Sequence, residues 1–223
     1  MSPLATQGAD VRDMLVVHQA FRDAYRRMPD LVRAVPAGDA DRAAVVCDHA
    51  DLIDDFLHLH HKGEDELLWP KLIERGSSDL RPTLALLEEQ HEEIDRLLAD
   101  SSSLRRQWRD TVDAATAERL ADCIELLGRK LTEHLAIEEE KVLTIVNQYL
   151  SAEEWHKIGE HAINGLPKKN LMVIFGMLAD IAEPAVVTLM LTTAPLVPRL
   201  ILPYLGPRAY AAYSKRVYGP AAV

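Results

Sequence analysis

Residues 57–70 read "LHLHHKGEDELLWP", and this stretch carries more information about fold and chemistry than any other part of the chain. Three histidines and three acidic residues fall within nine consecutive positions, and an apolar run follows them. The stretch lies where a predicted amphipathic helix ends. Its polar side chains are therefore either hydrated at a helix end or turned inward to hold a metal ion.

The composition is that of a folded, acidic protein. The chain has 223 residues, 48% of them hydrophobic, which suffices for one domain or for a domain with an extension. The 25 basic and 35 acidic residues give a net charge of -10, which argues against nucleic acid and against anionic lipid as partners. Cys47 and Cys123 lie in apolar helical patterns and are expected to be reduced core residues. Because no signal-peptide pattern opens the chain, we expect a cytoplasmic protein.

A helical period dominates the first 150 residues, and no alternating strand pattern competes with it. We expect helices over residues 10–28, 39–69, 81 onward and 113–150. Each predicted helix has an apolar stripe on one face. The stripe of the first is Val11, Met14, Phe21 and Tyr25, and that of the second is Val46, Ile53, Phe56 and Leu67. The stripe of the third is Leu84, Leu87, Ile94 and Leu98, and that of the fourth is Leu120, Ile124, Leu127, Leu131 and Ile145. Four amphipathic helices with short connections predict an all-α fold, an antiparallel up-down-up-down four-helix bundle.

The predicted connections contain helix-breaking residues. Two prolines and a glycine in residues 29–39 are expected to end the first helix. Pro70 and the following "RGSSD" are expected to end or kink the second helix. Ser78 or Asp79 is the expected cap of the third helix, with Pro82 in its first turn.

Residues 151–223 are predicted to form a helical extension beyond a bundle domain of residues 1–150. Ser151 and Glu154 have the spacing of a capping box, which opens another helix. The apolar part of this segment is interrupted by prolines, and its uncharged run is too short for a membrane span, which needs about 20 residues. We expect short helices that pack on the bundle, or that bind a second copy or a partner protein.

Each predicted bundle helix carries one histidine on its apolar stripe. These residues are His18, His60, His91 and His134. Glu64 and Glu138 follow the second and fourth histidine by four residues, so each lies on the same helix face as its histidine. A buried carboxylate without a partner is costly, so two of them in one core require cations or hydrogen-bond donors.

The four histidines are also predicted to lie at the same depth. His18 and His91 lie near the starts of two helices, and His60 and His134 lie near the ends of the two that run the opposite way. In an antiparallel bundle all four then meet at one end. Four imidazoles and two carboxylates can hold two metal ions there, with both glutamates as candidate bridges, and this donor set suits iron.

The order H…HxxxE…H…HxxxE resembles that of hemerythrin-like (HHE cation-binding) domains, over residues 10–150. The segment "HHKGEDELLWP" is very similar to the family's segment, in which an aromatic residue and a proline follow the ligand pair. The resemblance implies two non-haem iron ions, bridged by carboxylates and by an oxo or hydroxo group. Residues 151–223 resemble the tail of longer bacterial members.

The sequence departs from the oxygen-carrying hemerythrins at Asp95. Those proteins resemble this pattern but have a second histidine four residues after the one on the third helix. With four imidazoles in place of five, the resemblance favours a reactive or sensing centre over an oxygen carrier. Asp95 is either a replacement ligand or, as the burial habits of carboxylates favour, a solvated acid.

The remaining polar residues have plainer interpretations. His49 lies about three turns from the predicted site and is interpreted as structural. His58 and His61 are expected to face solvent or to support the ligands from outside. Tyr25 is a core aromatic residue or a hydrogen-bond donor near the metals. The side chains expected to face solvent are Glu66, Glu139, Glu140, His156 and His161.

Three functional hypotheses follow. The first is a di-iron redox protein that reacts with dioxygen, hydrogen peroxide or nitric oxide, with catalase-like turnover as one outcome. The second is a non-enzymatic sensor or iron-handling protein that acts through residues 151–223. The third is a helical interaction module whose histidines are incidental, which the cost of buried acids disfavours.

Overall fold

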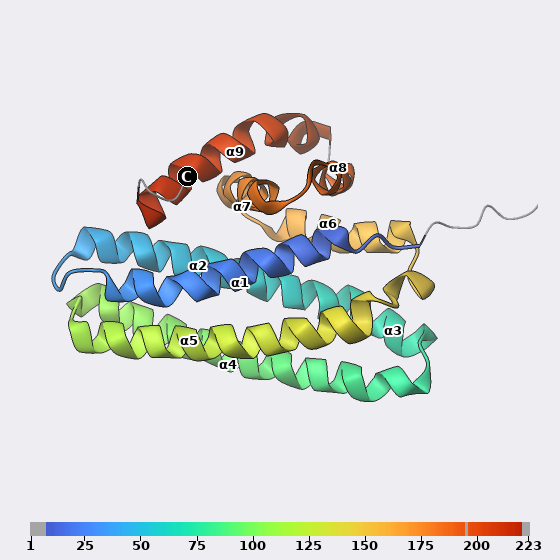
Figure 1. Cartoon of the computed structure of the whole chain (residues 1–223), viewed down its shortest axis with the longest axis horizontal. Helices are drawn as coiled ribbons and strands as arrows, with labels where there is room; N and C mark the ends of the chain where they lie inside the picture. The colour runs from blue at the N-terminus through green and yellow to red at the C-terminus, as the bar shows by residue number, and fades with distance from the viewer. Residues whose placement is uncertain (1–7, 195, 220–223) are drawn as a thin grey trace, which may run out of the picture.

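The computed structural model describes residues 8–194 and 196–219, and within these ranges the protein is helical, with no β-strand. Helices α1 and α4 each pack against both α2 and α5. Figure 1 shows these four rods side by side, with consecutive members running in opposite directions. They are α1 (Arg12–Arg33), α2 (Ala40–Gly63), α4 (Arg81–Thr111) and α5 (Ala114–Glu138). The predicted all-α, antiparallel four-helix bundle is confirmed.

Two helix limits differ from the prediction. Helix α1 continues through Pro29 to Arg33, so this buried proline does not end the helix. Helix α4 begins where predicted, but neither Ser78 nor Asp79 caps it. Both residues lie instead in a short 3-10 turn, η2 (Ser78–Leu80).

The second predicted helix is interrupted by a π-helical turn, η1 (Glu64–Leu68). A π turn adds one residue to the helix and so shifts the inward-facing positions that follow it. Leu68 is accordingly fully buried and Leu67 only half-buried, the reverse of the expectation. The α-helix resumes as α3 (Trp69–Arg75), with Pro70 in its first turn, where no N–H donor is needed.

A second π turn, η3 (Glu139–Leu143), ends helix α5. The single helix predicted to residue 150 is therefore wrong beyond α5, since the chain continues through η3 into a short 3-10 turn, η4 (Val146–Gln148). The extra residue again moves the core positions by one. Val146 is fully buried, whereas the predicted core residue Ile145 is only half-buried.

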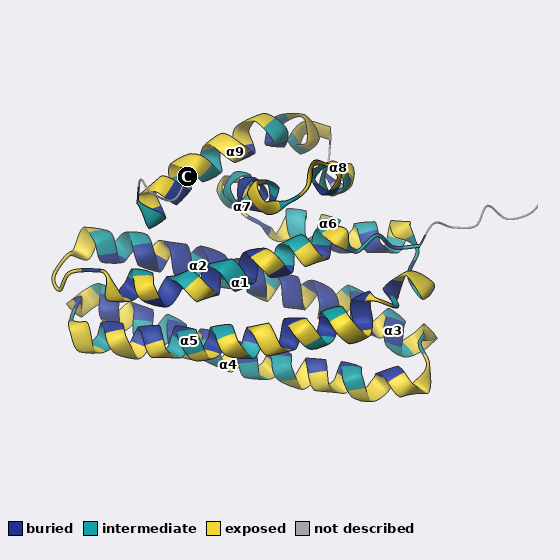
Figure 2. Ribbon diagram, in the orientation of Figure 1, coloured by how far each residue is buried: buried dark blue, intermediate teal, exposed yellow. Residues whose placement is uncertain are grey.

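The core extends along the whole bundle, with buried residues on the facing sides of the four helices (Figure 2). Phe21, Met28, Trp69 and Trp108 are among the largest side chains that are almost completely buried. Both cysteines are free thiols, and Cys47 is a buried core residue as predicted, whereas Cys123 is only half-buried.

Helices α6 to α9 lie along one side of the bundle, next to α1 and α2 (Figure 1). The predicted capping box forms at the start of α6, where Ser151 and Glu154 exchange hydrogen bonds with each other's backbone N–H. None of the helices described is long and apolar enough to cross a membrane. The division of the chain near residue 150 into a domain and an extension stays a prediction. The limits of these helices are α6 (Ala152–Gly165), α7 (Lys168–Ile181), α8 (Pro184–Thr193) and α9 (Leu196–Tyr218).

Candidate metal centre

The structure brings all six predicted site residues together inside the bundle. Each side chain is buried or nearly so. His18 Nε2 lies 3.4 Å from a carboxylate oxygen of Glu138, and His60 Nε2 lies 3.3 Å from one of Glu64. The six residues are His18 of α1, His60 of α2, Glu64 of η1, His91 of α4, and His134 and Glu138 of α5.

The structure adds His61 to this cluster. Its side chain, expected at the margin of the site, is only 3% exposed and stacks on His91 with ring centroids 4.0 Å apart. Among the residues described, neither ring nitrogen of His61 has a hydrogen-bond partner. Because a buried imidazole without a partner is costly, His61 belongs with the candidate ligands and not with the surface histidines.

Carboxylates outside the cluster hold two of the imidazoles in a defined orientation. His91 Nδ1 lies 2.8 Å from Asp65, and His18 Nδ1 lies 2.9 Å from Glu139. A carboxylate can only accept, so each Nδ1 carries the proton and donates it outward. The Nε2 lone pair of each ring is then directed into the cluster, as metal ligation requires. Glu139, expected to be a solvated surface charge, instead positions a candidate ligand.

Two ring nitrogens face each other without an obvious partner between them. His134 Nδ1 lies 3.2 Å from Gln90 Oε1 and donates to it, so its Nε2 is also directed inward. His91 Nε2 and His134 Nε2 are 3.2 Å apart. With both protons on the outer nitrogens, two lone pairs meet at this distance. A proton or a metal cation is needed to make the arrangement stable.

Both glutamates also lack hydrogen-bond donors. Within the described part of the chain, no carboxylate oxygen of Glu64 or Glu138 has a hydrogen-bond partner. The ligand atoms form two groups, in each of which they lie within 4.8 Å of one another, and Glu64 belongs to both. One group is His18, His60, Glu64 and Glu138, and the other is His61, Glu64, His91 and His134. The donor set therefore fits two cations with a shared carboxylate.

The pKa shifts of the clustered side chains also indicate that the cluster can hold a cation. Burial, followed by the charge of Glu64, raises the pKa of Glu138 to about 8. Burial also raises the pKa of Glu64 and lowers the pKa of His60 and His61 well below the ordinary histidine value. All these shifts disfavour charge. His91 is the exception, because despite its burial the neighbouring carboxylates of Asp65 and Glu64 raise its pKa to about 10. A single imidazolium cannot balance both buried glutamates, so an additional cation would favour their ionised forms.

Comparison with known families agrees with this geometry. The family model described as the hemerythrin HHE cation-binding domain matches residues 9–146, which contain all seven clustered side chains. The chain belongs to this family. No curated protein and no solved structure matches the chain. The hemerythrin domain of this protein therefore carries a buried histidine and glutamate cluster that can bind metal cations.

Two residues that were candidates for the centre lie outside it. Asp95 is exposed, and one of its carboxylate oxygens lies 3.6 Å from Nδ1 of the exposed His58. It is the solvated acid that burial statistics favour. Tyr25 is buried, but its hydroxyl donates to Asp54 at 2.7 Å and to none of the clustered residues. Neither side chain belongs to the two ligand groups of the hemerythrin domain.

Of the other polar residues singled out in the sequence, some lie where they were predicted and some do not. His49 is structural as predicted, since both its ring nitrogens lie within 3.0 Å of tyrosine hydroxyls on α9. Glu66 and Glu140 are exposed as predicted. His156 and His161, expected to be solvated, are both half-buried because α6 packs against the bundle.

Proposed function

We propose that this hemerythrin domain binds two iron ions and reacts with small oxidants such as hydrogen peroxide, dioxygen or nitric oxide, with catalase-like turnover as its activity. The observation that carries the proposal is the buried cluster of imidazole nitrogens and carboxylate oxygens that lack hydrogen-bond partners among the described residues. One ion would be held by each ligand group, with Glu64 shared. The bound irons would supply Lewis acidity and electrons to the oxidant.

The residues around the cluster support chemistry on a small, uncharged oxidant. Phe21 packs against His60 with ring centroids 5.2 Å apart, and Trp69 lies 6.1 Å from His91. These apolar rings exclude water from the ligands and so limit side reactions. The proposed set has five imidazoles, since His61 joins the four predicted. The imidazole count therefore does not separate a reactive centre from an oxygen carrier, and turnover has to be measured.

Two outer carboxylates can move protons between the cluster and solvent. The Asp65 side chain is 46% exposed and accepts from His91 Nδ1, and the Glu139 side chain is 26% exposed and accepts from His18 Nδ1. Reduction of peroxide to water consumes protons, and its oxidation to dioxygen releases them. Asp65 and Glu139 lie between these imidazoles and solvent and would hold protons for this exchange at the edge of the cluster, because an imidazole with Nε2 on a metal cannot pass a proton through its ring.

The alternative is a non-enzymatic sensor or iron-handling protein. Its support is the contact between helix α6 and the π turn η1, which contains Glu64. The ring of His161 and the side chain of Ile158 both pack close to Gly63, the residue before that turn. Metal binding or loss at η1 would therefore change the packing of α6. In this reading the C-terminal helices present a metal-dependent surface to a second copy or to another protein.

Metal content and peroxide turnover, measured on the same preparation, test the proposal. We expect about two irons per chain and oxygen evolution from peroxide in the wild-type protein. Glu64→Gln removes the shared carboxylate and should abolish turnover and lower metal content by at least half. Glu66→Gln, in the same π turn but exposed, is the matched control and should change neither. Wild-type protein that is stable, folded and free of metal would contradict the proposal.

The sensor alternative gives a different result in the same samples. Wild-type protein would then bind iron but not evolve oxygen. Limited proteolysis would cleave within residues 152–218 faster after chelation than before it. If cleavage does not depend on metal while oxygen is evolved, the sensor alternative is wrong.

A further inference from the structure

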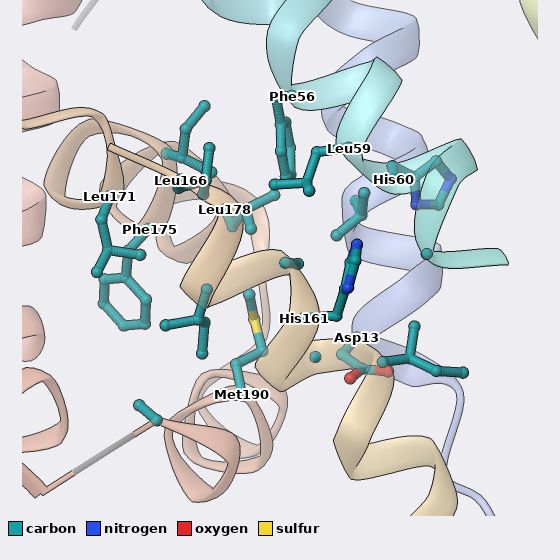
Figure 3. Close-up of a pocket in the computed structure, with 18 of the residues that line it drawn as sticks. Asp13, Phe56, Leu59, His60, His161, Leu166, Leu171, Phe175, Leu178 and Met190 are labelled. Carbon is teal, nitrogen blue, oxygen red and sulfur yellow. The ribbon is translucent and has the colours of Figure 1, made fainter. Parts of the chain in front are cut away.

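A cavity of about 120 Å³ lies between the bundle and the C-terminal helices, next to the metal centre, whose candidate ligand His60 forms part of its wall. Its walls come from α1, α2, α6, α7, α8 and α9. Figure 3 shows His60 and Asp13 on the side of the cavity formed by the bundle, with Leu171 and Phe175 on the opposite side. The C-terminal helices therefore close a space that the bundle alone would leave open to solvent.

The cavity walls are apolar apart from a few groups. Aliphatic and aromatic residues such as Phe56, Leu59, Ile174 and Leu178 line most of it. Water is poorly accommodated in such a space, because each molecule needs two to four polar partners. A dry cavity of about 150 Å³ binds benzene or xenon in a well-studied engineered protein, so a volume of this order is enough for one small organic molecule.

One polar atom in the wall requires a partner. His161 Nε2 is buried, and among the described residues it has no hydrogen-bond partner. Figure 3 shows the His161 ring at the edge of the cavity, near His60 and Asp13. The Asp13 carboxylate already accepts from Trp155 Nε1 at 3.0 Å and from the Met14 amide at 2.9 Å. His60 Nε2 also lacks a partner, but it lies 3.3 Å from Glu64 and belongs to a ligand group of the metal centre. His161 Nε2 is therefore the unpartnered nitrogen of this wall that the metal centre does not account for.

We infer that this cavity is a binding site for a small, uncharged, mainly apolar molecule that carries one hydrogen-bonding group, such as a hydroxyl or a carbonyl. The apolar part fills the space between the bundle and helices α7 to α9, and the polar group bonds to His161 Nε2. A full charge is excluded because the walls cannot solvate it, and an anion is further repelled by Asp13. The bound molecule contacts both His60 and the C-terminal helices, so it links the extension to the metal centre.

Matched aromatic probes test the inference on the full-length protein. Phenol, benzene and benzoate share a ring and differ in their polar group. We expect phenol to raise the melting temperature by about 2–4 °C at several times its Kd, benzene to raise it less, and benzoate to have no effect. A crystal grown with phenol should show it in the cavity. Equal shifts for all three, or no shift with phenol, would overturn the inference.

Two pairs of variants locate the binding. Ala162→Leu fills the cavity from α6 and should abolish the phenol shift, whereas Ala212→Leu adds the same side chain at an exposed position on α9 and should preserve it. His161→Phe keeps an aromatic ring and removes the hydrogen-bonding nitrogen, so phenol should lose its advantage over benzene. His156→Phe, on the same helix outside the cavity, should keep that advantage. An unchanged preference in His161→Phe would refute the role of His161.

The test is independent of the proposed di-iron function. Metal content is measured on every preparation, and the cavity variants should keep that of the wild type. Phenol binding in a protein without metal would refute the metal centre and leave this inference standing. A metal-loaded protein that binds no phenol would refute this inference and leave the metal centre standing.

Discussion

The bundle contains two clusters of ionisable side chains around its core, and only one of them includes a fixed positive charge. In the first, Arg105 pairs with Asp54 at 2.6 Å and with Asp51 at 2.9 Å, and it donates to Ser101. Tyr25 donates to the other oxygen of Asp54. In the second, the clustered histidines and glutamates carry no fixed positive side chain, and many of their inward-facing atoms have no partner among the described residues.

This difference shows what the second cluster lacks. The carboxylate of Asp54 is paired with the guanidinium of Arg105, so this acid is neutralised by a side chain of the bundle itself. At Glu64 and Glu138 the neighbouring side chains are imidazoles, which burial keeps uncharged or which share protons with the acids. The cluster can thus take up positive charge from outside the chain, and a metal cation is the proposed source of that charge.

Removal of the metal should have the largest effect on stability. Because a cation that binds only the folded state stabilises it by mass action, we expect chelation to lower the free energy of unfolding by about 4 kcal/mol when free metal had exceeded Kd about 1,000-fold. Urea denaturation of loaded and chelated protein measures it. A chelated protein as stable as the loaded one would mean that the second cluster, like the first, needs no external cation.

Removal of the Arg105 guanidinium from the first cluster should have the second-largest effect on stability. Arg105→Met leaves Asp54 buried with only Tyr25 as a donor, and we expect a loss of about 3 kcal/mol in the free energy of unfolding, with no loss of bound metal. Arg106→Met is the matched control, since this exposed neighbour only donates to Ser102 and should change stability by less than about 0.5 kcal/mol. Similar losses in the two variants would refute the importance of the buried pair.

The pH dependence of stability should change with metal loading. The folded-state pKa of Glu138 is raised to about 8 from an ordinary value of 4.5, mainly by burial, so the metal-free folded protein holds a proton that the unfolded chain has released. The resulting stability is complete below pH 4.5 and is lost as pH rises through about 8. His91 acts in the same direction above pH 6.5: although its burial opposes protonation, a hydrogen bond to Asp65 and the nearby carboxylate of Glu64, 3.5 Å away, raise its pKa to about 10.

We therefore expect the free energy of unfolding of the metal-free protein to fall between pH 6.5 and pH 8. In the loaded protein it should hold or rise, because metal replaces the protons. Denaturation curves at several pH values in this window provide the measurement. Glu138→Gln should flatten the slope of the metal-free protein, and the exposed control Glu140→Gln should not. Parallel slopes with and without metal would contradict this interpretation.

The smallest change in the free energy of unfolding is expected from replacing either of two buried histidines, His49 and His61. Both nitrogens of His49 are hydrogen-bonded, to Tyr213 at 2.8 Å and to Tyr218 at 3.0 Å, whereas neither nitrogen of His61 has a partner among the described residues. In metal-free protein, His49→Leu should cost about 1–2 kcal/mol and His61→Leu should be neutral or stabilising. In loaded protein His61→Leu should also weaken metal binding. Equal costs in the metal-free form would show that His61 is an ordinary core residue.

Much of the centre could be predicted from helical spacing alone. The stripe positions of His18, His60, His91 and His134 follow from the 3.6-residue period, and their common depth follows from the antiparallel order of the helices. Up to each predicted glutamate the period is unbroken, so the residues that converge are those expected.

Predictions from the helical period were wrong in two places. One is where two adjacent residues of a helix both face the core, and the other is where the backbone is not α-helical. Adjacent residues on a helix point about 100° apart, which seemed to exclude His61 once His60 faced inward. The core here is wide enough for both, because His61 turns toward α4 and stacks on His91. The π turns that begin at Glu64 and Glu139 leave no clear mark in the pattern, so Leu67 and Ile145 were each predicted one position before the buried residue. The position of Glu139 beside His18 was missed as well.

Anomalous X-ray diffraction from crystals of the iron-loaded protein, collected above and below the iron absorption edge, tests the metal centre most directly. We predict two anomalous peaks inside the bundle, one among His18, His60 and Glu138 and the other among His61, His91 and His134, with Glu64 beside both. Crystals of loaded protein with no peak in the bundle, or with iron only on the surface, would contradict the assignment.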